Sequence, residues 1–173
     1  LDCFTDGRVI GDKLPDQKSV NLIDLLIGKY PIKNGDRTNV VRTKLYKKFA
    51  PMKSYPGEKN FNPHFMHLQI SQDHDFLVLN KNLRFVEYQP DGSSNSMFRQ
   101  YLKNPRGFAF WRTVKMKYDT TFKRRVVDCI HYCSSAQVGK IKGFIKDSPY
   151  PVLTVLCVPA GWVLTALIRR KAG

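Results

Sequence analysis

The chain has 173 residues, of which 42% are hydrophobic, so it is long and apolar enough for a folded domain and is not a disordered chain. Its formal net charge of +15 favours an anionic partner, such as nucleic acid, an anionic lipid surface or acidic subunits of an assembly. The charge is uneven, because the residues after Gly92 hold 15 Lys and Arg against three Asp. The C-terminal half therefore carries most of the positive charge.

The first 18 residues predict an extended, turn-rich and acidic lead-in that can lie across a basic neighbour. Ser19 is the expected cap of a short helix, because apolar residues then recur at helical spacing and Gly28 fits as its C-terminal stop. A second helix is predicted from about residue 39 to residue 50, with one apolar stripe among lysines and arginines. The Pro- and Gly-containing segment 53–63 predicts a loop.

A small antiparallel β-meander is predicted next, with strands at 66–70, 76–79 and 83–88 separated by polar turns. A short helix is expected at 97–103, and an Asn-Pro pair ends it. Large apolar and aromatic residues then alternate along 108–118, which predicts a long strand with one aromatic face.

A further helix is expected to begin at Thr120 or Thr121, and it contains the one metal-like pattern of the chain. Cys129, His131 and Cys133 would share one side of a strand, whereas on a helix only the two cysteines share a face. A zinc site normally needs a second pair of closely spaced ligands, and none is evident. We therefore expect free, buried thiols and assign neither a metal nor another cofactor.

Basic and aromatic residues are interleaved between Arg99 and Arg125, and this stretch is the candidate binding surface. Cations of this kind neutralise phosphates of RNA or of lipid headgroups, and an exposed ring can stack on a base. The candidate lipid- or nucleic-acid-binding residues are Arg99, Lys103, Arg106, Trp111, Arg112, Lys115, Lys117, Lys123, Arg124 and Arg125.

The segment 151–168 contains no charged residue, and its length predicts a single C-terminal transmembrane helix. Pro159 lies within it, so a membrane-spanning helix would be kinked there and packed against other helices. The alternative is a buried strand followed by a helix that starts at Pro159. The expected membrane anchors are Tyr150, Trp162, Arg169, Arg170 and Lys171.

No catalytic motif is present: the chain lacks a Gly-rich phosphate loop and a recognisable nucleophile and base. A small hydrolase or nuclease would require His64, His67 or His74 to meet an acid in a pocket. The enzyme class therefore stays open, and a non-catalytic role is preferred.

Together these patterns predict an α+β fold, divided into an acidic lead-in at 1–18, a basic domain at 19–147 and a membrane helix at 148–173. The function they favour is that of a non-catalytic accessory subunit of a membrane protein complex, expected at the mitochondrial inner membrane. Its expected partners are other subunits and anionic lipid. The alternative is a soluble, basic RNA-binding protein, such as a peripheral subunit of a cytosolic or mitochondrial ribosome.

Overall fold

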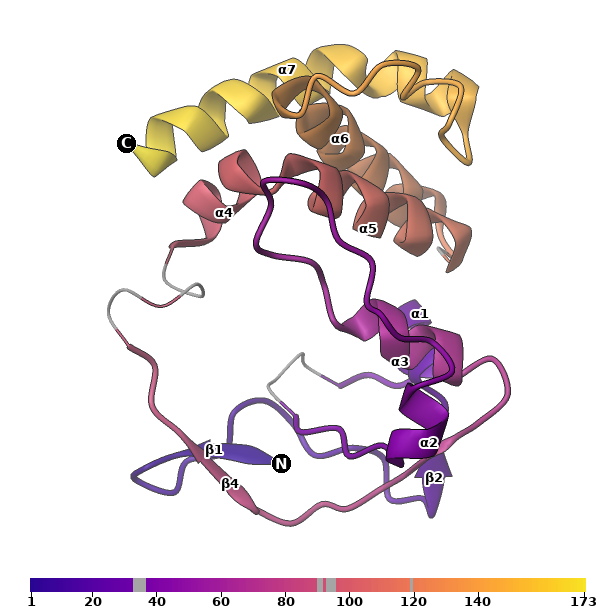
Figure 1. Ribbon diagram of the computed structural model, residues 1–173, viewed down its shortest axis with the longest axis vertical. Coiled ribbons are helices and arrows are strands. Elements are labelled where there is room, and N and C mark those ends of the chain that lie inside the picture. Colours follow the sequence, from indigo (N-terminus) through magenta and orange to yellow (C-terminus); the bar gives the residue numbers. More distant parts are fainter. Residues whose placement is uncertain (33–36, 90–91, 93–95, 119) are drawn as a thin grey trace. The chain divides into compact units, whose positions relative to one another are not determined.

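A computed structural model describes residues 1–32, 37–89, 92, 96–118 and 120–173. The chain forms two compact units. Unit 1 comprises Leu1–Met52 and Met66–Pro90, and unit 2 comprises Lys53–Phe65 and Asp91–Gly173. Helices predominate and strands are few (Figure 1). The predicted division into 1–18, 19–147 and 148–173 stays a prediction.

The described part of unit 1 contains two small sheets. Strand β1 (Asp2–Phe4) pairs in parallel with β4 (Arg84–Val86), and β2 (Ser19–Val20) pairs antiparallel with β3 (Phe76–Leu77). Two of the three strands predicted for the meander are therefore present, but each pairs with a strand near the N-terminus. The carboxylate of Asp2 is fully buried and accepts a hydrogen bond from Arg84 Nη2 at 2.6 Å. The acidic lead-in thus contributes a strand to its own unit.

Helix α1 (Leu22–Ile27) begins two residues later than expected, because Ser19 lies in β2. Its cap is Asn21, whose side-chain oxygen accepts a hydrogen bond from the Ile23 backbone N–H at 2.9 Å. The predicted stop is confirmed: Gly28 adopts the left-handed conformation with φ of 77°, which a residue without a Cβ reaches at little cost.

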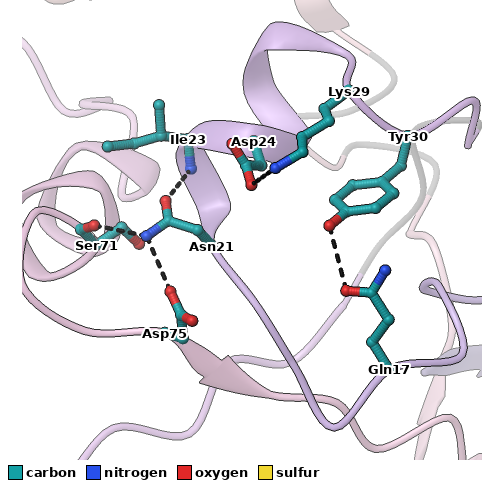
Figure 2. Close-up of polar contacts among 8 residues, drawn as sticks. All are labelled: Gln17, Asn21, Ile23, Asp24, Lys29, Tyr30, Ser71 and Asp75. Carbon is teal, nitrogen blue, oxygen red and sulfur yellow. Dashed lines mark hydrogen bonds and ion pairs between the residues drawn. The ribbon is translucent and has the colours of Figure 1, made fainter.

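Asn21 also joins α1 to a distant part of unit 1 (Figure 2). Its side-chain nitrogen donates hydrogen bonds to the Ser71 carbonyl at 2.8 Å and to Asp75 Oδ1 at 3.1 Å. One amide side chain therefore caps the helix and fixes the chain that leads into β3. A neighbouring ion pair, Lys29 with Asp24 at 2.7 Å, lies on the surface.

Two elements between residues 39 and 70 differ from the prediction. Helix α2 covers only Thr43–Tyr46, so the predicted helix at 39–50 is mostly irregular. The predicted strand at 66–70 is wrong, because this segment belongs to helix α3 (His64–Ile70). Met66 and Ile70 share a face of α3 and Leu68 lies on another, yet all three are buried. A short helix that is buried on two sides therefore has the alternating pattern of apolar residues that is expected of a strand.

In unit 2 the described residues form the helices α4 (Met97–Lys103), α5 (Pro105–Tyr118), α6 (Phe122–Val138) and α7 (Pro151–Ala172). The bounds predicted for α4 are confirmed. Helix α6 has Thr121 as its cap, with the hydroxyl oxygen 3.3 Å from the Arg124 backbone nitrogen. The predicted strand at 108–118 is wrong, since these residues lie within α5.

Helix α5 starts where the sequence indicated only that a helix ends. Pro105 occupies its first turn, where its missing N–H costs nothing. The carboxylate of Glu58 accepts hydrogen bonds from the backbone N–H groups of Arg106 and Gly107, both at 2.8 Å. Buried Asn104 in turn accepts two from backbone N–H groups of the 53–65 segment, both at 2.9 Å. The predicted loop therefore acts as a clamp on the start of α5.

Helix α6 is the centre of unit 2, because it packs against both α5 and α7, while α4 contacts the C-terminal part of α7 (Figure 1). The packed core consists of Ala109, Met116, Cys129, Tyr132, Cys133 and Cys157. All four cysteines of the chain are free and buried. The segment 151–168 forms one helix that continues through Pro159, so the alternative of a strand followed by a helix is wrong.

Replacing Asn21 with Ala should destabilise unit 1 locally by about 1–2 kcal/mol, because one change removes a helix cap and two hydrogen bonds to the 71–75 segment. Hydrogen exchange of amides in α1 and at residues 71–77 measures this effect. The matched control is Asn82→Ala, which changes an exposed residue of the same unit. Equal protection in both variants would contradict the proposed role of Asn21.

Candidate functional site

The two sides of α7 differ in side-chain size. The buried side carries small or β-branched residues at intervals of three and four: Thr154, Cys157, Gly161, Thr165 and Ile168. This spacing follows the helical repeat, so these residues form one continuous stripe. The stripe faces Cys129, Cys133 and Ser134 of α6.

Gly161 marks the closest approach of α7 to α6. A Cβ atom added there would lie 2.5 Å from Cys133 Cβ and 3.1 Å from the Ser134 backbone nitrogen, so only glycine fits without movement. Close approach through small residues is typical of tightly packed helix pairs. Ala160, the neighbouring small residue, is exposed.

Hydroxyl groups complete this contact. Thr165 donates to the Gly161 carbonyl at 2.9 Å, and its oxygen lies 2.9 Å from the hydroxyl of Ser134. Thr154 donates to the Tyr150 carbonyl at 2.9 Å and lies 2.6 Å from the Ser148 hydroxyl. The buried polar groups on this side of α7 are therefore satisfied within unit 2, as interior packing requires.

The opposite side of α7 is apolar and exposed. Its large residues are Val152, Val155, Leu156, Trp162, Val163 and Leu167, with exposed fractions from 49% to 77%. We call these six residues the outward face. A contiguous apolar patch of this kind on a soluble surface is unfavourable and marks an interaction site. The core helix of a soluble protein would be mostly buried, whereas only 28% of the most apolar 18-residue window of α7 is buried.

The ends of α7 carry the predicted anchors. Tyr150 precedes the first turn, and the guanidinium of Arg125 lies 5.2 Å from the centre of its ring. At the other end Arg169, Arg170 and Lys171 are exposed, and Lys171 Nζ lies 5.2 Å from the centre of the Phe98 ring. Cations in the last turn of a helix also interact favourably with its dipole.

The predicted basic set lies on three different helices. Arg99 and Lys103 are on α4; Arg106, Arg112, Lys115 and Lys117, with Trp111, are on α5; Lys123, Arg124 and Arg125 are on α6. Six of them are exposed: Arg99, Lys103, Arg106, Lys117, Lys123 and Arg124.

Arg112 and Lys115 point inward instead. Arg112 Nη1 is hydrogen-bonded to Asp128 Oδ1, and Lys115 Nζ lies 2.7 Å from Asp128 Oδ2. The Asp128 side chain is only 3% exposed, so these two cations stabilise a buried carboxylate. This cluster was not predicted from the sequence. An isolated acidic residue in a strongly basic stretch, such as Asp128, is a signal that nearby cations pair with it.

The aromatic residues near these cations take part in packing. The ring centroid of Phe110 lies 4.9 Å from that of Phe65 and 5.5 Å from that of Phe61, and the Phe108 centroid lies 4.4 Å from that of Tyr101. Trp111 is half-buried. The rings of Phe108 and Phe110 are therefore occupied by contacts within unit 2.

Cys129, His131 and Cys133 do not converge. Cys129 and Cys133 lie in the packed core, and burial raises the pKa of the Cys133 thiol to about 12. The His131 ring lies 6.2 Å from that of Tyr101, on another side of α6. Within the described residues, no three His, Cys, Asp or Glu side chains form a group that could hold a metal ion.

Comparisons with protein-family models, with curated proteins and with solved structures gave no match. Of the helices that the structure describes, α7 alone is long and apolar enough to cross a membrane, by length and composition.

Gly161→Ala should destabilise unit 2 by roughly 1–3 kcal/mol, because the new methyl group overlaps Cys133. At an open helical position the same change would stabilise by about 1 kcal/mol, so the sign of the effect reports the contact. Denaturant unfolding measures it. Ala160→Val, at the neighbouring exposed position, should cost less than about 1 kcal/mol. A stability gain in Gly161→Ala would show that α7 is not held against α6.

Partial burial, and next the positive charge of Arg112, lower the pKa of His131 from 6.5 to about 4. Neutral His131 is therefore preferred in the folded state, and the stability of unit 2 should fall as the pH drops from about 6.5 toward 4. Thermal melting between pH 7 and pH 5 should show a smaller pH dependence in His131→Gln than in the native chain. A pH dependence in His131→Gln as large as that of the native chain would contradict this role of His131.

Proposed function

We propose that this chain is a non-catalytic accessory subunit of a membrane protein complex, attached to the membrane by α7. The observation that carries the proposal is the outward face, which exposes six large apolar residues on a helix without a charge between residues 151 and 168. Burying such a face against lipid or an apolar partner recovers roughly 25 cal/mol for each Å² removed from water. In a chain that acts alone in water, the outward face would stay exposed to solvent and would not gain this stabilisation.

The charge of the chain supports the same proposal. Unit 2 contains 17 Lys and Arg against five Asp and Glu, and six of the predicted basic residues are exposed on α4, α5 and α6. Anionic lipid headgroups attract such cations by about 1 kcal/mol each when the cations lie near the surface, and acidic subunits would act in the same way. The compartment that we propose is the mitochondrial inner membrane, where anionic lipid suits a chain of charge +15.

RNA binding is the second candidate. It is supported by the exposed cations, which could neutralise phosphates, but the neighbouring rings of Phe108 and Phe110 pack inside unit 2. RNA binding also leaves the outward face of α7 without a role. The membrane proposal accounts for both the cations and the apolar helix, so it is the one that the geometry supports best.

Flotation of cell membranes through a density gradient at physiological salt tests the proposal. The full-length chain should rise with the membranes and, after mild detergent extraction, migrate on a native gel within a larger complex. The matched variants are Leu156→Asp on the outward face and Leu83→Asp in unit 1, because these leucines are similarly exposed at 71% and 68%. Leu156→Asp should reduce flotation and Leu83→Asp should not. A native chain that stays in the soluble fraction, bound to RNA in a salt-dependent manner, would replace this proposal with the second candidate.

A further inference from the structure

The buried side of α7 is covered along almost its full length. Near the N-terminus Thr154 contacts Ser148, in the middle Gly161 meets Cys133, and near the C-terminus Lys171 lies over Phe98 of α4. From Thr154 to Lys171 the helix rises about 26 Å, close to the hydrocarbon thickness of roughly 30 Å. No stretch of α7 long enough to cross a bilayer extends beyond the protein that covers it.

A membrane-crossing orientation would therefore carry α4, α5 and α6 into the hydrocarbon. These helices bring the buried charges of Asp128, Arg112 and Lys115, together with exposed cations such as Lys117 and Lys123. A charge in the bilayer centre is strongly unfavourable unless it reaches water or a partner. The length of α7 is therefore sufficient to cross a membrane, but the charged helices of unit 2 make a crossing orientation unfavourable.

The alternative is that α7 lies in the plane of the membrane surface. An interfacial helix buries its apolar side about 5–10 Å into the headgroup and acyl boundary, roughly half the diameter of a helix. The outward face supplies that apolar half, and α6 covers the other half. The buried stripe carries no charge because protein rather than water covers it, so α7 does not show the charged side of a free amphipathic helix.

The charges of unit 2 select the kind of surface. Arg169, Arg170 and Lys171 end α7, and Arg170 lies seven residues, about two turns, after Val163 and so shares its side of the helix. The segment 148–173 contains no Asp or Glu. We propose that the outward face of α7 inserts in plane into one leaflet of an anionic bilayer, with these cations on the headgroups. This inference rests on the proposed membrane attachment and specifies its geometry and lipid class.

Vesicle binding tests the lipid contact with the purified full-length chain. Vesicles of phosphatidylcholine mixed with phosphatidylglycerol should bind it, and vesicles of phosphatidylcholine alone should bind it at least tenfold more weakly. Leu156→Asp should weaken binding to the mixed vesicles by roughly tenfold or more, because it places a charge on the inserted side. Leu83→Asp adds the same charge at a similarly exposed leucine in unit 1 and should bind as the native chain does.

The position of Trp162 tests the orientation. Trp162 lies at the midpoint of α7, so it would be near the bilayer centre if the helix crossed and near the headgroup boundary if the helix lay in plane. In the Trp111→Phe background its fluorescence can be quenched by phosphatidylcholines brominated at different depths. Quenching should be strongest with bromines nearest the headgroup. Tags at both ends of the chain should also remain accessible to protease added outside sealed vesicles.

The possible outcomes separate the two proposals. Strongest quenching by the deepest bromines, with a protected C-terminal tag, would overturn the in-plane orientation and leave membrane attachment intact. Equal binding to both vesicle types would overturn the anionic-lipid requirement. If purified chain binds no vesicle but still floats with cell membranes, a partner subunit rather than lipid covers the outward face. If it binds neither, the proposed function fails as well.

Discussion

The close approach of Gly161 to Cys133 is the constraint on which the arrangement of unit 2 depends. Because a Cβ at residue 161 would overlap Cys133, α7 can sit this close to α6 only with its small residues turned inward. That orientation brings the Thr165 hydroxyl within 2.9 Å of Ser134. The same helical repeat then places Leu156 and Trp162 on the other side, away from the core. The apolar outward face is thus a geometrical consequence of the contact at Gly161.

The charged residues of unit 2 are also divided into a buried group and an exposed group. Asp128 holds Arg112 and Lys115 against α6, which removes two of the nine predicted cations from the binding surface. Replacing a buried partner would leave an uncompensated charge, so this cluster specifies how α5 and α6 pack. It also leaves a net positive field beside half-buried His131, which adds to the effect of burial on that side chain. The remaining cations keep long-range electrostatic attraction for an anionic surface.

The sequence predicted α4, α6 and the continuous apolar segment of α7 well, because caps and long apolar patterns are local signals. It misassigned α3 and α5 for one shared reason. In each case an Asn-Pro pair, Asn62-Pro63 or Asn104-Pro105, predicts a loop or a helix stop. In the structure the Asn62 side chain accepts a hydrogen bond from the backbone N–H of His64, and Pro105 occupies the first turn of α5. Alternating large residues then imitated a strand, because these helices are buried on more than one side. The pairing of β1 with β4 and the clamp of Glu58 on α5 depend on residues far apart in the chain, and no local pattern encodes them.

For α7 the sequence showed the length and the composition of the helix. It did not show which side of the helix is covered by protein and which side is exposed. A hydropathy pattern treats Thr154, Cys157 and Thr165 as slightly weaker members of a membrane span. In the folded chain they are residues that hold the helix on α6, while Leu156, Trp162 and Val163 face outward. A crossing helix must be compatible with lipid or an apolar partner around its whole circumference, whereas an interfacial helix needs only one apolar side. Since α6 and α4 cover one side of α7 from Thr154 to Lys171, the apolar side that remains is suited to one leaflet rather than to both.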